Sequence, residues 1–278
     1  MPLPAGQLEL DFIPEPSDTR LRLVRASSNR ALWDTCARRF LSGIEGHVGP
    51  TGYPAAVWLA HRTQRDALYQ RAADLGLPGW LSPPIYFLSE LPGLFDIPGR
   101  AIGLFTRRRL INRLATEVGS DLGIGTAGTG SFRGHVLDGL FSELLPEGVA
   151  PERLHETLER VARDSFSRRR NEWVGRVYSA YLDALTERGL YDPRSIHAMV
   201  ADRIRDGRLP SGLPDATALH VYGVTSLRTR HSLFAALAGQ PDVEVSVYLP
   251  AAGETDEWSE LPATHEIVGS DEQCYMPV

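Results

Sequence analysis

Short apolar runs alternate with helical patterns in the first third of the chain. Residues 21–24 (Leu-Arg-Leu-Val) predict a first strand, and residues 31–41 predict a helix whose apolar positions recur at helical spacing. A second strand is predicted at residues 55–60, a helix at 63–75 and a third short strand at 83–88. The pattern is therefore strand, helix, strand, helix, strand.

A similar unit follows much later in the chain. Residues 218–224 form a short apolar run of the kind that makes a buried parallel strand. A turn and a helix over 232–237 come next, Gly239 and Pro241 end the helix, and residues 243–249 predict another strand. Because parallel strands need a wide sheet covered by helices, we expect these strands to join the earlier ones.

Between these two regions the pattern changes to consecutive helices. Their predicted ranges are residues 105–118, 132–145, 151–166, 171–188 and 193–205. The sequence therefore predicts an α/β fold of RecA-like (P-loop NTPase-like) form, in which an all-helical insertion interrupts a parallel sheet.

The predicted organisation has five segments. They are a flexible N-terminal tail at 1–19, the first part of the sheet domain at 20–100, the helical insertion at 101–210, the remainder of the sheet domain at 211–252 and a weakly ordered C-terminal segment at 253–278. Proline and acidic residues are frequent in both terminal segments.

The composition of the chain excludes several kinds of catalytic and binding site. The chain has 278 residues and a formal net charge of −6, and all 29 of its basic residues are arginine. Without lysine, a Schiff-base site, a P-loop lysine and the lysine of a metal-dependent nuclease motif are excluded. Two distant cysteines, Cys36 and Cys274, make no disulfide framework, so we expect a cytoplasmic protein. No apolar run reaches the length of a membrane span, and no signal peptide opens the chain.

The position after the first strand is where an α/β nucleotidase holds phosphate. That position here contains Ser27, Ser28, Asn29 and Arg30, with neither glycine nor lysine. A degenerate phosphate loop is the hypothesis, and one of the serines or the asparagine suits a helix cap better. Residues 223–226 (Gly-Val-Thr-Ser) bring no carboxylate for magnesium. We therefore expect no cofactor, no metal and no catalytic residue in this chain.

One further motif is a weak signal for an enzyme, and two common enzyme signatures are missing from the sequence. Residues 123–128 (Gly-Ile-Gly-Thr-Ala-Gly) match the dinucleotide-binding fingerprint, but a predicted helix precedes them where a strand is needed, which favours an interhelical loop. Serine-hydrolase and zinc-protease signatures are absent from the sequence, and the eight histidines do not cluster.

Two dense basic runs lie in the helical block. The candidate DNA-binding residues there are Arg107, Arg108, Arg109, Arg113, Arg168, Arg169 and Arg170. Helix faces of this kind can follow a phosphate backbone. The alternative is a solvated face whose arginines pair with nearby acids.

The N-terminal tail contains an alternating apolar hexapeptide, residues 7–12 (Gln-Leu-Glu-Leu-Asp-Phe). It resembles the short motif by which bacterial DNA polymerases and repair factors dock on the sliding clamp. That resemblance assigns the contacts to Gln7, Leu8, Leu10 and Phe12. The alternative is an edge strand, or a segment that packs on its own domain.

Four stretches together resemble a larger family. They are residues 21–40 at the phosphate-loop position, 57–63, the run 177–192 with its Tyr-x-x-Tyr-x-x-x-Leu pattern followed by Gly-Leu-x-Asp, and 221–227 continuing to 243–250. Their order is similar to the first RecA-like domain of superfamily-one helicases. It is closer still to the N-terminal, inactivated helicase-like region of the AddB/RexB-type ATP-dependent nuclease subunit, a PD-(D/E)XK nuclease family.

The resemblance implies a function in double-strand-break repair by homologous recombination. Such a chain would bind or scaffold single-stranded DNA or duplex ends beside an AddA-type helicase-nuclease partner, without ATPase or nuclease activity of its own. Arg62, Thr63 and Arg65 would join the arginine runs as DNA contacts, and replacing Arg107–Arg109 with alanine would weaken binding. The alternatives are a small α/β enzyme or ligand-binding protein, and an interaction module that docks on the sliding clamp.

Overall fold

The computed structural model describes residues 20–45, 47, 52–74, 84–124, 130–208, 216–227, 230–250, 258, 261 and 263–268. These residues fall into two compact units. The first lies within Met1–Leu88, Ser211–Leu227 and Ala235–Val278, and the second within Ser89–Pro210 and Arg228–Phe234. The units divide after residues 88 and 210, whereas the sequence pattern places these boundaries at 100 and 210.

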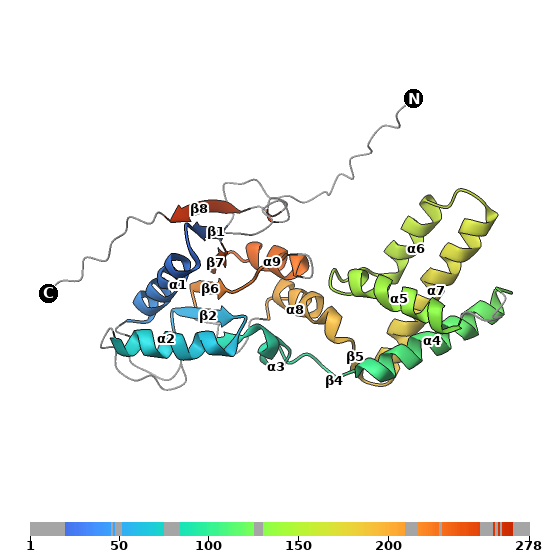
Figure 1. Cartoon of the computed structure of the whole chain (residues 1–278), viewed down its shortest axis with the longest axis horizontal. Coiled ribbons are helices and arrows are strands. Elements are labelled where there is room, and N and C mark those ends of the chain that lie inside the picture. Colours follow the sequence, from blue (N-terminus) through green and yellow to red (C-terminus); the bar gives the residue numbers. More distant parts are fainter. Residues whose placement is uncertain are drawn as a thin grey trace, which may run out of the picture. The chain divides into compact units, whose positions relative to one another are not determined.

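The first unit is an α/β domain with a six-stranded parallel sheet (Figure 1). Its strands are β1 (Leu21–Ala26), β2 (Ala55–Leu59), β3 (Ile85–Phe87), β6 (Ala218–Tyr222), β7 (Glu244–Leu249) and β8 (Thr264–Val268), in the order β3-β2-β6-β7-β1-β8. The blue strand β1 therefore lies between β7 and the red strand β8, from the other end of the chain (Figure 1). The prediction of an α/β fold with a parallel sheet is confirmed.

Apolar side chains bury both faces of this sheet, as expected for parallel strands. Helices α1 (Asn29–Ile44) and α2 (Arg62–Asp74) pack on one face, where Phe40 and Leu68 join Val57 in a single core. The opposite face buries Trp58 and Val247 completely. The continuous apolar runs that predicted these strands follow directly from this burial on two sides.

Strand β8 lies inside residues 253–278, the segment that the sequence pattern marks as weakly ordered. It pairs in parallel with β1 at the edge of the sheet. Only one of its faces meets the domain, and an ion pair from Glu266 to Arg39 anchors it there. Ile267 is 83% exposed, so the strand shows little of the apolar pattern from which strands are recognised.

The second unit is mainly helical. Its longer helices are α4 (Leu104–Asp121), α5 (Gly130–Leu144), α6 (Pro151–Arg160), α7 (Ser165–Glu187) and α8 (Ile196–Arg205). Its short elements are the 3-10 turn η2 (Pro193–Ser195), helix α3 (Leu91–Leu94), and strands β4 (Arg100–Ala101) and β5 (Leu190–Tyr191), which pair in parallel. The 3-10 turn η1 (Leu88–Glu90) begins at the last residue of the first unit's opening segment. Helix α9 (His231–Ala238) runs from the second unit into the first. Ile111, Phe141 and Tyr181 lie at the centre of the helical core.

The predicted helices at 151–166 and 171–188 are wrong at their common boundary. Helix α6 ends at Arg160, and α7 begins at Ser165. Asp164 caps α7 through a capping box: its Oδ1 accepts from the Ser167 backbone N–H at 2.6 Å, and Ser167 Oγ accepts from the Asp164 N–H at 3.0 Å. No glycine or proline marks this break, so the apolar pattern runs across it.

Candidate nucleic-acid interface

The connection at the phosphate-loop position is very short. Strand β1 ends at Ala26 and α1 begins at Asn29, so Ser27 and Ser28 alone join them. Ser28 is the N-cap of α1, because its Oγ accepts from the Ala31 backbone N–H at 3.2 Å. The prediction of a helix cap here is confirmed at Ser28. A two-residue connection gives the backbone too little length to wrap around a phosphate.

The end of β6 approaches the start of α2 closely. Gly223 has a φ of +88°, and a Cβ there would lie 2.8 Å from Gln64 Nε2 and 2.9 Å from Ala60 Cβ. Glycine is therefore required for this close approach. The residues that follow it in this structure, Val224 to Ser226, supply no carboxylate at this edge of the sheet.

The predicted DNA contacts at the start of α2 have different environments. Arg62 and Thr63 are exposed, and Arg65 is half-buried. The guanidinium carbons of Arg62 and Arg65 lie 5.9 and 4.9 Å from the ring centroid of Phe87. This stacking holds Arg65 against the domain and leaves Arg62 and Thr63 accessible at the carboxyl edge of the sheet.

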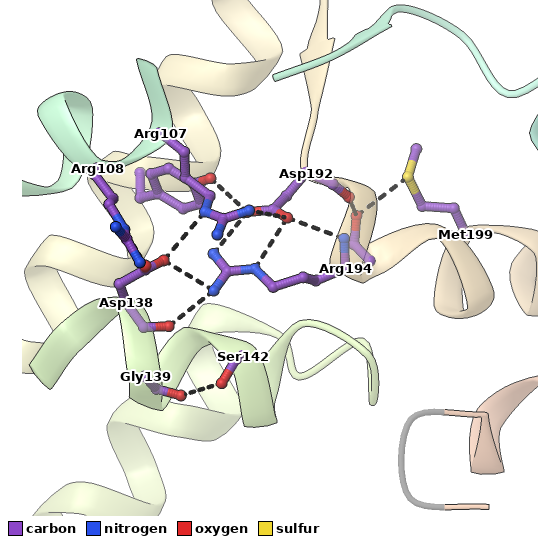
Figure 2. Close-up of polar contacts among 10 residues, drawn as sticks. Arg107, Arg108, Asp138, Gly139, Ser142, Asp192, Arg194 and Met199 are labelled. Atoms are coloured by element: carbon purple, nitrogen blue, oxygen red, sulfur yellow. Dashed lines mark hydrogen bonds and ion pairs between the residues drawn. The ribbon is translucent and has the colours of Figure 1, made fainter. Parts of the chain in front are cut away.

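The first arginine run is divided between the inside and the outside of the helical unit. The Arg107 side chain is 14% exposed, and its Nε donates to Asp138 Oδ1 at 3.1 Å (Figure 2). The Arg108 side chain is 52% exposed and lies 3.4 Å from Asp138 Oδ2. Arg109 is exposed, and Arg113 pairs with Glu117 at 3.6 Å on the surface of α4.

Asp192 is the centre of this network. Its carboxylate accepts two hydrogen bonds from the Arg194 side chain, at 3.0 Å from Nε and 2.8 Å from Nη2, one from the Arg194 backbone N–H at 3.0 Å, and one from the Tyr181 hydroxyl at 2.6 Å. Burial alone would raise the pKa of Asp192, but the hydrogen bonds from Arg194 and Tyr181 outweigh it and hold that pKa below its usual value. Arg194 Nη1 continues to Asp138 at 2.9 Å (Figure 2).

This network explains part of the sequence pattern at residues 177–192. Tyr181 and Asp192 belong to the Tyr-x-x-Tyr-x-x-x-Leu and Gly-Leu-x-Asp letters, and here they bond to each other. Tyr178 donates to the Val149 carbonyl at 2.8 Å, and Leu185 is buried in the core. These residues hold the helical unit together. The sequence prediction missed the ion pairs of Asp138 with Arg107 and Arg194, because these residues become neighbours only in the folded chain.

The second arginine run lies at the start of α7. Arg168, Arg169 and Arg170 are all exposed, and no ion pair joins any of them to another residue within the described part of the chain. Phe166 beside them is 77% exposed and Val161 is 59% exposed. An exposed aromatic ring among arginines is typical of surfaces that bind nucleic acids.

The structure keeps the two arginine runs apart. Helices α4 and α7 are antiparallel, since Trp173 Nε1 donates to the Ala115 carbonyl at 3.0 Å and Arg107 lies near Asp192, beyond the far end of α7. Arg109 precedes Ala115 on α4, and Arg168 precedes Trp173 on α7. The runs are therefore offset by roughly 15–20 Å along the helix axes at 1.5 Å per residue.

The clamp-motif residues 7–12 and Cys274 lie outside the residues that the structure describes. Cys36 is described and is buried, and burial raises the pKa of its thiol. The glycine-rich motif is described only at Gly123 and Ile124, which follow α4. In the described ranges, no group of three or more histidine, cysteine, aspartate or glutamate side chains could hold a metal ion.

Among the helices that the structure describes, none combines the length and apolarity needed to cross a membrane.

Comparisons with protein-family models and with curated proteins found no match for this chain.

Proposed function

We propose that this chain is a RecA-like DNA-binding module that acts without nucleotide, in the manner of the inactivated helicase-like region of an AddB-type repair nuclease. The arrangement of the elements supports the proposal. A parallel sheet carries β1 between β7 and β8, and the helical elements come between β3 and β6 in the sequence. The order of the elements along the sequence, with a helical block between two parts of one sheet, is the order that the resemblance implies for a RecA-like domain.

The corner between α6 and α7 is the observation on which DNA binding rests. Arg168 and Arg169 offer guanidinium groups that no described acid neutralises, and Phe166 offers an exposed ring. Guanidinium groups bind phosphates, and an aromatic face stacks on any base. Arg107 is not part of this surface, because Asp138 and Asp192 already surround its guanidinium.

The geometry at the phosphate-loop position supports nucleotide independence. Ser28 Oγ already accepts a first-turn N–H of α1, and the connection before it has no glycine. The carboxyl end of β6 brings no carboxylate at Gly223 to Ser226. Both halves of an ATP-hydrolysing site are missing from these positions, so DNA affinity is expected to be the same with and without ATP and magnesium.

Fluorescence anisotropy with a labelled single-stranded oligonucleotide and a labelled duplex end tests the proposal. We expect the native chain to bind, and the variant Arg168/Arg169→Ala to bind at least tenfold more weakly at low salt. The matched control is Arg113/Arg176→Ala, which removes surface arginines that Glu117 and Glu172 already pair. A native chain that binds neither DNA, or equal losses in both variants, would contradict the proposal.

A further inference from the structure

A pocket of about 230 Å³ opens in the first unit at the amino ends of β1, β2, β6 and β7. Its lining includes Arg22, Arg39, His220, Glu244 and Ser246. Open α/β sheets bind ligands at the carboxyl ends of their strands, which is the edge where Ser28 caps α1 here. The pocket therefore lies at the opposite edge and is separate from the phosphate-loop position.

Two buried polar side chains stand side by side in this pocket. His220 of β6 and Ser246 of β7 are direct partners in the sheet register, and they are 6% and 3% exposed. They lie on the face that α1 covers, where parallel sheets are otherwise apolar. Within the described residues, no hydrogen bond engages Ser246 Oγ or His220 Nε2. Both residues line the pocket, so these two atoms are available to a molecule that enters it.

The ring of His220 has one hydrogen-bond partner inside the domain. Its Nδ1 lies 3.1 Å from the Tyr248 hydroxyl. In the tautomer in which Nδ1 accepts from this hydroxyl, Nε2 carries the ring proton and is a donor toward the pocket. Burial, together with Arg39 and Arg22, lowers the pKa of His220 to about 4, so the ring is neutral at pH 7.

The two arginines of the pocket are held differently. Glu266 binds Arg39 through both carboxylate oxygens. Arg22 lies 2.7 Å from Glu244, these two side chains are 40% and 47% exposed, and the Nη1 of Arg22 also donates to Glu266 at 3.5 Å. Exposed ion pairs such as Arg22–Glu244 contribute little stability. Arg22 is thus the cation whose partner Glu244 can be replaced by another anion.

We propose that this pocket binds a small oxyanion, either phosphate or a short carboxylate, through Arg22, the Nε2–H of His220 and the hydroxyl of Ser246. Glu244 leaves Arg22 as the anion enters. The volume is below the roughly 300–1,000 Å³ of sites for drug-sized ligands, which excludes a nucleotide. This site is independent of DNA binding by the helical unit.

Thermal unfolding of the whole chain, titrated with sodium phosphate or sodium malonate against sodium chloride at equal ionic strength, tests the site. A ligand that binds the folded state raises the melting temperature saturably. We expect one of the two anions to saturate at lower concentration, which distinguishes a phosphate site from a carboxylate site. Glu244→Gln removes the competing carboxylate and is expected to raise affinity about tenfold.

Ser246→Ala and Arg22→Gln are expected to lower affinity about tenfold or more. The control is Arg25→Gln, which lies on the same strand but on the opposite face of the sheet, and it is expected to keep native affinity. Circular dichroism establishes whether each variant folds. If Arg22→Gln does not fold, the affinity of Ser246→Ala for the anion tests the proposal alone. The proposal is overturned if neither the native chain nor Glu244→Gln shows a saturable rise in melting temperature. It is also overturned if Ser246→Ala binds the anion with native affinity.

Discussion

Residues 107–109 on α4 and 168–170 on α7 are each three consecutive arginines near the start of a long helix. The first run has Arg107 folded inward onto Asp138 and Asp192, while the second run is entirely exposed. The difference comes from acids that other elements bring close: Asp138 lies on α5, and Asp192 follows β5. A basic run in a sequence therefore does not reveal which of its charges remain available to a ligand.

The two runs also differ in what they contribute to stability. A nearly buried ion pair is costly to break, because removing one partner leaves the other charge uncompensated away from water. An exposed arginine contributes little to folding. We therefore expect mutations in the first network to act on stability, and mutations in the second run to act on binding.

The largest expected effect is that of Asp192→Ala. This change leaves Arg194 and Tyr181 without their common acceptor and removes the carboxylate 3.8 Å from Arg107, which is expected to destabilise the second unit by about 3–5 kcal/mol. Hydrogen exchange of the α7 core amides measures the unfolding free energy of this unit alone. The control is Asp202→Ala, whose exposed pair with Arg205 contributes about 0–1 kcal/mol. A loss below 1 kcal/mol in Asp192→Ala would show that the network is not structural.

Arg107→Ala and Arg168→Ala test the contrast within the runs directly. We expect Arg107→Ala to cost about 2–4 kcal/mol, because Asp138 loses a donor at 3.1 Å in a nearly buried site. Arg168→Ala is expected to change stability by less than about 0.5 kcal/mol. The same exchange measurement applies to both variants. Equal effects would remove the distinction between the two runs.

The pH dependence of stability sharpens the contrast further. Hydrogen bonds from Arg194 and Tyr181 depress the pKa of folded Asp192 in spite of its burial. A depressed folded pKa contributes stability that is present above the unfolded value of about 3.9 and is lost as pH falls through the folded value. We expect the unfolding free energy of the native chain to decrease as the pH is lowered below about 4, and to decrease less steeply in Asp192→Asn. Parallel profiles for the two proteins would exclude Asp192 as a source of this dependence.

The smallest expected effect concerns the turn that presents the second run. Asp164→Ala removes the acceptor for the Ser167 N–H, so the first turn of α7 is expected to fray. Faster amide exchange at residues 167 and 168, with unchanged exchange in the core of α7, is the expected result. Unchanged exchange at both residues would mean that the capping box does not order this turn.

Much of the sheet could be predicted from the sequence, because both faces of β2 and β6 are buried and their apolar runs are continuous. Strand β8 could not, since its contact with α1 is made by Glu266 and Ile267 faces outward. The pattern also ran across the break before α7, which is marked only by Asp164 and Ser167. Alternating or mixed residues at an edge or a cap carry too weak a signal.

The candidate site was predictable only as a set of arginines. Composition and spacing identified both runs, and the structure separates them by their neighbours. Nothing in the local sequence around Arg107 indicates Asp138 or Asp192, because that proximity depends on how α4, α5 and β5 pack. Conversely, the exposure of Phe166 beside Arg168 depends on where α6 ends. Tertiary packing decides both outcomes.

The salt dependence of single-stranded DNA binding tests the central claim most directly. We would measure the affinity of the native chain, Arg168/Arg169→Ala and Arg113/Arg176→Ala across a range of salt concentrations. For single strands, each lost phosphate contact lowers the slope of log affinity against log salt by about 0.7, so Arg168/Arg169→Ala is expected to lower it by about 1.4. Arg113/Arg176→Ala is expected to keep the native slope. A native slope in Arg168/Arg169→Ala would contradict the assignment of this corner as the DNA-binding surface.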